Sequence, residues 1–324
     1  MPYTSAVPFF ARARPRPPGV LVDIGGRRLH AVVRGAATPT IVFEGGAGEW
    51  STHWGDLPAQ AATLGRTVVY DRAGLGWSDL APRPRTCDVL ARDLEALLRR
   101  LDVDGPLVLV AHSFGALVVR AFAAATSRPL AGVVLVDGYP ETLPARLRAA
   151  GIPDPEPSPY LLRVWALAAR VGLLRVLDLA AAAGAWIDRR RGRTAPVAPH
   201  PLPPAALATL EAMSTDPRVL EGLARELADG TASDRIAARL PRRLAAPLRV
   251  LTSTAPIGPD DWVAPGVDRA AYNRIWVEAQ ADLVALASDV QQLLVTDSDH
   301  AVQLHRPDLV LGAIEQLEAE GLVS

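Results

Sequence analysis

One stretch, PLVLVAHSFGALVVR at residues 106–120, constrains the fold more than any other part of the chain. It begins as an apolar run typical of a buried strand, turns at Ser113, and continues with the apolar spacing of a helix. In the pattern G-x-S-x-G, a sharp strand-to-helix corner exposes the serine hydroxyl, and small residues on either side let strand and helix approach closely. Here the small residues are Ala111 and Gly115. The stretch therefore predicts a serine nucleophile at the carboxyl end of a strand.

Strand-like segments alternate with helical ones through most of the chain. A pair of short strands is expected at residues 20–24 and 28–33, joined by Gly25-Gly26, a dipeptide typical of hairpin turns. Further strands are expected at residues 40–43, 66–70, 107–110, 132–136, 248–252 and 291–296. Strands alternating with helices predict an α/β fold whose mostly parallel sheet is covered by helices on both faces.

Composition excludes several classes of protein. A chain of 324 residues, 49% of them hydrophobic, can bury the core of one large domain, with or without an insertion. Its net charge of -1 gives no general attraction to nucleic acid, and no apolar run has the length of a membrane span. The chain has no lysine, which rules out a Ser-Lys dyad and Schiff-base chemistry. With Cys87 as its one cysteine, it needs no disulfide, and we expect a cytoplasmic protein without stable membrane insertion.

The domain organisation follows from changes in composition and hydrophobic pattern along the chain. Residues 1–19 are rich in arginine and proline and are expected to form a flexible arm. Residues 20–138 and 246–324 carry the strand signals, so they should build the two parts of one core. Between them, residues 139–245 contain helical segments separated by Pro-rich connectors and no strand-like run. This segment predicts an all-helical insertion.

A glycine-rich loop, Glu44-Gly45-Gly46-Ala47-Gly48, directly follows the strand at 40–43. Such a loop exposes backbone N–H groups, and we expect the N–H of Gly46 and the N–H of Phe114 to form an oxyanion hole beside Ser113. Neither G-K-[ST] nor G-x-G-x-x-G occurs here, so the loop does not indicate nucleotide binding. No histidine, cysteine or carboxylate group has metal-ligand spacing, and no metal is expected.

Four segments occur in order along the chain: VFEGGAGEW, YDRAGLGWSD, LVAHSFGALVVRAFA and VVLVDGYPE. Together they resemble the serine-nucleophile branch of the α/β-hydrolase superfamily, in particular bacterial hydrolases with a DRAGLGWSD-type turn. The resemblance implies the α/β-hydrolase fold, in which residues 139–245 form a cap or lid over the active site. It also implies a Ser-acid-His triad that needs no cofactor, and it places the general base, His300, in the loop after the last strand.

The other histidines are expected to be structural. His305 is the nearest competitor to His300, but it lies just before Arg306-Pro307, at the entry of a helix. His112 adjoins Ser113 in the chain and is expected to point elsewhere.

The triad acid has three candidates. Most relatives carry it beyond the strand at 248–252, where Asp260 and Asp261 lie behind an inserted Pro-Ile-Gly-Pro. Asp137 instead ends the strand at 132–136, on the same sheet edge as Ser113, and some branches of the superfamily place their acid there. Asp260 and Asp261 could reach His300 only if their loop folds back, so Asp137 is the preferred acid. The order Ser113, Asp137, His300 is also the order expected for this fold.

The expected activity is hydrolysis of an ester or related acyl small molecule with an apolar portion. Trp165 and Trp186, in the apolar helical run of the insertion, are candidate substrate-binding residues. Acyltransferase, thioesterase and C–C bond hydrolase activities need the same triad and stay open, as does a non-catalytic binding protein on the hydrolase scaffold. Epoxide hydrolase or dehalogenase chemistry would need an aspartate in place of Ser113.

Overall fold

An eight-stranded sheet runs through the computed structural model, which describes residues 14–153, 158–174, 201–258 and 266–321. The strand order is β1-β2-β4-β3-β5-β6-β7-β8. The β1–β2 and β2–β4 pairs are antiparallel, and all the pairs from β4 to β8 are parallel. The strands are β1 Val20–Asp23, β2 Arg28–Arg34, β3 Thr40–Glu44, β4 Arg66–Tyr70, β5 Leu107–His112, β6 Leu130–Val136, β7 Leu248–Ser253 and β8 Val290–Val295. The predicted fold class, with its mostly parallel sheet, is confirmed.

The central strands are apolar on both faces because both faces of the sheet are covered. In β3, the side chain of Val42 belongs to one buried layer, and the side chains of Ile41 and Phe43 belong to the other. The same alternation occurs in β5 and β6. Burial on both sides explains why these strands read as continuous apolar runs in the sequence.

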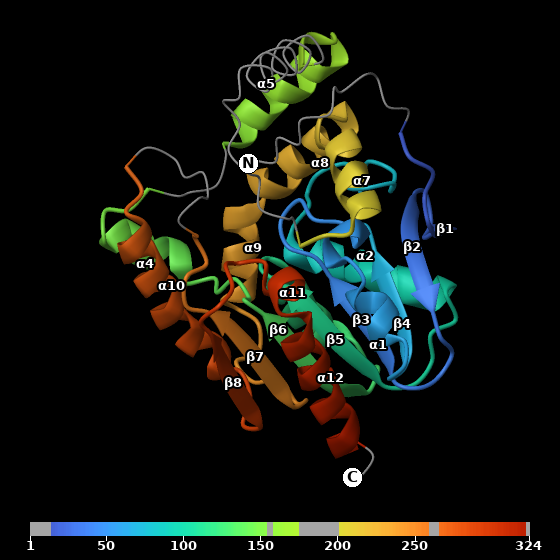
Figure 1. The fold of residues 1–324 in the computed structure, drawn as a ribbon, viewed down its shortest axis with the longest axis vertical. Coiled ribbons are helices and arrows are strands. Elements are labelled where there is room, and N and C mark those ends of the chain that lie inside the picture. Colours follow the sequence, from blue (N-terminus) through green and yellow to red (C-terminus); the bar gives the residue numbers. More distant parts are fainter. Residues whose placement is uncertain (1–13, 154–157, 175–200, 259–265, 322–324) are drawn as a thin grey trace, which may run out of the picture.

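Helices form the two outer layers (Figure 1). On one face, α2 (Cys87–Arg100), α3 (Gly115–Ala125) and α9 (Gly230–Ala237) contribute to the larger apolar core. On the other face, α1 (Leu57–Ala61) and α12 (Pro307–Gly321) pack against the sheet. Beside β7, α10 (Arg269–Val284) packs with α4 (Leu143–Ala149). These layers hold the parallel strands so that their carboxyl ends meet along one edge.

In its described part, the chain between β6 and β7 forms helices and connecting loops and no strand. Besides α4 and α9 it contains α5 (Pro159–Arg170), α7 (Pro204–Ser214) and α8 (Pro217–Ala228). Figure 1 shows α5, α7 and α8 beyond the sheet edge at which the parallel strands end. Two short elements, η1 (Ser51–Trp54) and α11 (Val302–His305), lie in the loops after β3 and β8. Helices and loops thus surround one edge of the sheet.

Candidate active site

Ser113 occupies the corner between β5 and α3. Its φ of +48° lies in the left-handed region, which residues with a side chain rarely adopt. The corner is held by hydrogen bonds from the Ser113 N–H to the Val136 carbonyl (3.3 Å) and from the Tyr139 N–H to the Ser113 carbonyl (2.9 Å). A β-carbon on Gly115 would lie 2.6 Å from the Glu44 carbonyl oxygen, so only glycine lets α3 begin this close to the glycine-rich loop. A strained, well-supported corner of this kind is common at functional sites.

The first turn of α3 starts at the same corner. Phe114 precedes the helix, and within the described residues its N–H has no hydrogen-bond acceptor. The first N–H groups of a helix lack intrahelical acceptors, and the helix dipole favours negative charge beside them. The Phe114 N–H is therefore available to an anion at the corner.

Asp137 and His300 meet at this edge of the sheet. Asp137 directly follows β6, has a φ of +44° and is fully buried. Its Oδ2 atom lies 2.6 Å from His300 Nδ1, while Oδ1 accepts hydrogen bonds from the Ser253 N–H (3.0 Å) and from Trp276 Nε1 (2.9 Å). The three contacts orient the carboxylate. Of the alternative acids, Asp260 and Asp261 lie outside the described residues.

The ring of His300 lies between two other aromatic rings. Its centroid is 4.5 Å from that of His112 and 5.1 Å from that of Trp276. The side chain is 34% exposed. The hydrogen bonds found among the described residues do not include one between the Ser113 hydroxyl and His300. In free enzymes this bond is often long and tightens only when substrate binds.

His305 does not share these contacts. It lies at the end of α11, and its Nε2 atom is 3.7 Å from Asp299 Oδ2. The structure thus brings His300, and not His305, to Asp137.

His112, which was expected to point elsewhere, contacts the loop that carries His300. Its Nε2 atom lies 2.9 Å from the His300 carbonyl oxygen, and its Nδ1 atom lies 2.8 Å from Glu49 Oε2. Burial lowers the pKa of His112, but the charge and hydrogen bond of Glu49 outweigh burial and raise it above its ordinary value. Burial likewise raises the pKa of Glu49, but the charge and hydrogen bond of His112 and the charge of His53 lower it well below the usual range. The 2.8 Å contact thus favours the charged forms of both side chains beside Ser113.

Gly46 has a different partner from the one expected. Its N–H donates to Glu49 Oε2 (2.6 Å), so in this arrangement the N–H is not free to bind an oxyanion. A β-carbon on Gly46 would lie 3.0 Å from Glu49 Oε2, 3.0 Å from His112 Nδ1 and 3.1 Å from the Ser113 β-carbon. The missing side chain therefore lets these three groups converge.

Arg72, in the DRAGLGWSD turn, binds the carbonyl groups of the glycine-rich loop. Its guanidinium donates to the carbonyls of Gly45 and Gly46 (both 2.6 Å) and to Glu44 Oε1 (2.7 Å). It also pairs with Glu226 of α8 at 2.6 and 2.8 Å. Burial lowers the pKa of Arg72, but the charges of Glu226 and Glu44 outweigh burial and raise it. The loop beside Ser113 is thus tied to the helical segment between β6 and β7.

Comparison with known proteins identifies the family of this fold. The family model for the alpha/beta hydrolase fold matches residues 39–252, more than half of the chain. The chain belongs to the α/β-hydrolase family. Its expected fold, read first from four sequence segments, is the fold of that family.

Solved α/β-hydrolase structures superpose on most of the chain. An esterase from Thermogutta terrifontis is 21% identical, with a TM-score of 0.58 over 91% of this chain and 94% of the esterase. A structure described as a putative epoxide hydrolase from Pseudomonas aeruginosa is 19% identical, with a TM-score of 0.60 over 95% of this chain and 98% of that chain. At such identities the likeness establishes the fold alone.

Curated relatives match shorter stretches. YqjL of Bacillus subtilis, described as an uncharacterized protein, is 38% identical over 115 residues, which are 35% of this chain and 46% of YqjL. A protein of Gibberella zeae described as an AB hydrolase superfamily protein is 36% identical over 97 residues, 30% of each chain. The matches thus span less than half the length of these relatives.

Several site residues of this α/β-hydrolase were not found from the sequence. Trp276 contacts Asp137 from α10, 139 positions along the chain, and no local pattern marks it. Glu226 reaches Arg72 across 154 positions. Glu49 follows Gly46 by three positions, and an acidic side chain at the end of a glycine-rich loop beside a nucleophile is a signal that sequence reasoning could have used.

Of the two candidate substrate-binding tryptophans, Trp165 belongs to the described residues and Trp186 does not. Trp165 lies on α5 and is 48% exposed. No contact between it and the site residues is found in the described part of the chain. Trp186 lies outside the described residues.

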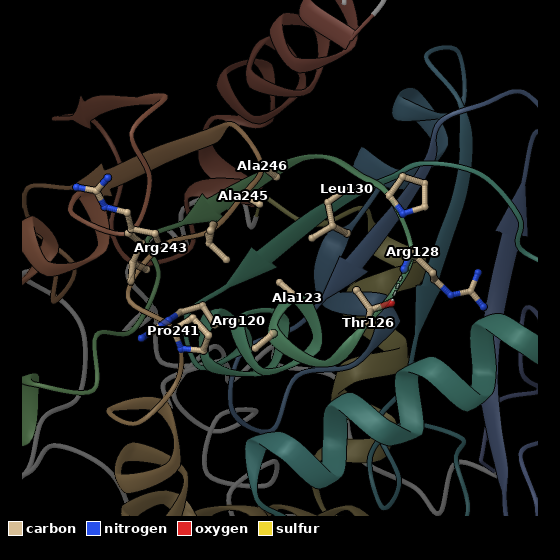
Figure 2. Close-up of a pocket in the computed structure, with 13 residues that line it drawn as sticks. Arg120, Ala123, Thr126, Arg128, Leu130, Pro241, Arg243, Ala245 and Ala246 are labelled. Carbon is tan, nitrogen blue, oxygen red and sulfur yellow. Dashed lines mark hydrogen bonds between the residues drawn. The ribbon is translucent and has the colours of Figure 1, made fainter.

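A pocket of about 430 Å³ lies away from this site (Figure 2). It is lined by the end of α3, the start of β6 and the turn before β7, at the opposite edge of the sheet from Ser113. Figure 2 shows the side chains of Arg128 and Arg243 extending to opposite sides, so their charges do not converge. Arg120 and Arg128 are paired with Glu141 and Glu95. We assign no role in the site to this pocket.

The described ranges contain neither a metal-binding cluster nor a membrane-spanning helix. There, no three His, Cys, Asp or Glu side chains cluster in a way that could hold a metal ion. None of the helices in the same ranges is both long and apolar enough to cross a membrane.

Proposed function

We propose that this α/β-hydrolase is a serine hydrolase that cleaves an ester or related acyl compound through Ser113, His300 and Asp137. The observation that carries the proposal is the 2.6 Å contact between Asp137 Oδ2 and His300 Nδ1, at the sheet edge where the strained Ser113 corner lies. A carboxylate on Nδ1 keeps the proton there and leaves Nε2 free to act as a base. The partial exposure of the His300 side chain suits that role.

In the proposed reaction the Ser113 hydroxyl attacks the substrate carbonyl carbon while His300 Nε2 takes the hydroxyl proton. The tetrahedral intermediate collapses, and the leaving alcohol takes the proton from His300. Water then attacks the acyl-serine with His300 again as base, which releases the acid and restores Ser113. Asp137 stays ionised and stabilises the imidazolium at each step.

The Phe114 N–H is the proposed oxyanion donor, since it starts a helix and has no acceptor in the described residues. Gly46 was expected to be the second donor. Because its N–H is bound to Glu49, it can act as a donor only after that bond opens. The proposal therefore rests on Phe114 and treats Gly46 as the position that lets the surrounding groups converge.

We further propose that residues 139–245, which carry the helices between β6 and β7, form a cap. This cap is inserted between the core segments 20–138 and 246–324. Glu226 of α8 accepts a hydrogen bond from the Gly48 N–H (3.1 Å), so α8 rests on the loop next to Ser113. Apolar side chains on α5, Trp165 among them, support a substrate with an apolar portion. Because Cys87 is the one cysteine and the fold needs no disulfide, the cytoplasm is the proposed location.

A fluorophosphonate probe tests the proposal directly. The wild-type protein should be labelled at a single site, and Ser113→Ala should abolish both labelling and turnover of p-nitrophenyl esters while the protein stays folded. p-Nitrophenyl esters of rising acyl chain length would then define the acyl pocket. Trp165→Ala should alter the chain-length preference more than it alters the rate on p-nitrophenyl acetate. Adding an alcohol or a thiol acceptor would separate hydrolysis from acyl transfer. Labelling that persists in Ser113→Ala would move the nucleophile elsewhere.

A further inference from the structure

We propose that His112 and Glu49 act as a positioning pair for His300, separate from the contact with Asp137. This inference rests on the proposed function, because it assigns a role in placing the general base. Its basis is a continuous chain of contacts that runs from the Gly46 N–H through Glu49 and His112 to the His300 carbonyl.

The hydrogen-bond directions define the role of each group. The His300 carbonyl oxygen can only accept, so His112 Nε2 is the donor in the 2.9 Å contact. Glu49 Oε2 accepts from His112 Nδ1 (2.8 Å) and from the Gly46 N–H (2.6 Å). His112 thus uses both of its N–H groups, one for the loop that carries the base and one for the carboxylate that anchors it.

The surroundings leave His112 little freedom. Its side chain is 4% exposed and that of Glu49 is 17% exposed. The His112 ring lies in contact distance of the His300 ring and packs edge-on to Trp54, with a centroid separation of 6.5 Å. The titratable groups that face the pair are His53 beside Glu49, the His300 ring beside His112, and Asp137, whose charge acts on His112. Burial and these contacts limit the conformations open to both side chains.

His300 is then held at three points. Asp137 binds its ring, the carbonyl of Pro256 accepts its N–H (3.1 Å), and His112 binds its carbonyl. Asp137 fixes only the tautomer and the tilt of the ring. The two backbone contacts fix where the ring stands relative to Ser113, and the contact from His112 comes from the residue directly before the nucleophile. A shift of about 1 Å in a reacting group can cost about 100-fold in rate.

Two substitutions of His112 separate its two nitrogens. In His112→Gln the side-chain amide nitrogen reaches the place of Nε2 and can still donate to the His300 carbonyl. In His112→Asn the amide nitrogen reaches only the place of Nδ1, so the contact with Glu49 is kept and the contact with His300 is lost. We expect His112→Gln to retain about a third or more of the wild-type kcat on p-nitrophenyl acetate, and His112→Asn to lose about 30- to 100-fold. KM should change little in both variants.

Glu49 gives a second, independent test. Glu49→Leu removes the anchor of His112 and should lower kcat about tenfold or more, whereas Glu49→Gln, which can still bind the Gly46 N–H and His112 Nδ1, should restore most of it. Because the two residues act as one unit, the double variant Glu49→Leu/His112→Asn should lose no more than His112→Asn alone. Fully additive losses would contradict a shared role.

Activity is expressed per fluorophosphonate-labelled site, since a purely structural role would reduce the number of sites and leave the kcat of each site unchanged. Equal kcat per site in His112→Gln and His112→Asn would overturn the inference while leaving the proposed function intact. A wild-type protein that is not labelled, or a Ser113→Ala variant that is, would overturn both. If His112→Asn does not fold, the comparison of Glu49→Leu with Glu49→Gln decides.

Discussion

Asp137 and His300 lie 163 positions apart in the chain and meet at 2.6 Å between Oδ2 and Nδ1. The contact joins the end of β6 to the loop after β8, across the intervening strand β7. Among the described residues Asp137 is the carboxylate on the His300 ring, while the other candidate acids, Asp260 and Asp261, lie outside them. The predictions below follow from this relationship and from the contacts around it.

Replacing Asp137 with asparagine should lower kcat by about 10⁴-fold, because the amide no longer fixes the Nδ1–H tautomer of His300. The amide oxygen can still accept from Ser253 and Trp276, so the fold should persist. Steady-state kinetics with a circular dichroism spectrum checks both points. Asp260→Asn and Asp261→Asn serve as matched controls and should keep near wild-type rates. An active Asp137→Asn beside an inactive control would move the acid to the later loop.

Trp276→Phe tests whether the buried carboxylate needs its second donor. The substitution keeps an aromatic ring beside His300 and removes the Nε1–H that binds Asp137 Oδ1. Hydrogen bonds to charged groups contribute about 1.5–3 kcal/mol, and part of that should appear as a roughly tenfold lower kcat with little change in KM. A variant with wild-type kcat would show that the bond from Ser253 orients the carboxylate alone.

Arg72→Met should destabilise the protein by about 3–5 kcal/mol, because it leaves Glu44 and Glu226 buried without their cation. Arg72→Lys should recover only part of this, since an ammonium group lacks the planar fork that reaches both carboxylates and two carbonyls. Urea unfolding measures the difference. The control is Arg92→Met, which breaks an exposed pair with Asp88 and should cost less than about 1 kcal/mol. Similar losses at the two arginines would contradict the assigned role of the buried network.

The His112–Glu49 pair should stabilise the fold most between pH 4.5 and 6.5. Glu49 has a pKa below its ordinary 4.5, so its contribution is present above that pH and is lost as the pH falls through the lower, folded-state value. His112 has a pKa above its ordinary 6.5, so its contribution is complete below that pH and is lost as the pH rises through the higher, folded-state value. Both contributions are therefore complete only between pH 4.5 and pH 6.5.

Urea unfolding of the wild type and of Glu49→Gln/His112→Gln, repeated across this range, tests that window. The difference in unfolding free energy should be largest near pH 5.5 and should shrink toward about pH 3 and about pH 9. A difference that does not vary with pH would mean that the two side chains are not an ion pair in the folded protein.

Much of the fold was predictable because it depends on local patterns. The turn at Ser113 needs small residues within two positions of it, and the hairpin at Gly25-Gly26 needs only its own dipeptide. The runs that became β3, β5 and β6 are apolar at every position because helices cover both faces, which is visible in the sequence as continuous hydrophobicity. Ser113 and Asp137 directly follow two of these runs, whereas His300 was predicted from the resemblance to the α/β-hydrolase superfamily.

The sequence by itself determined the order of strands and helices, the corner at Ser113 and the two residues that follow other strand ends, because these features depend on neighbours in the chain. Only the tertiary structure decided that Asp137 lies on His300, that Trp276 and Glu226 reach the site from distant helices, and that Glu49 takes the Gly46 N–H expected for an oxyanion. These contacts join residues whose separation along the chain carries no periodic or compositional signal. They arise when parallel strands bring their carboxyl ends to one edge and the covering helices close over it.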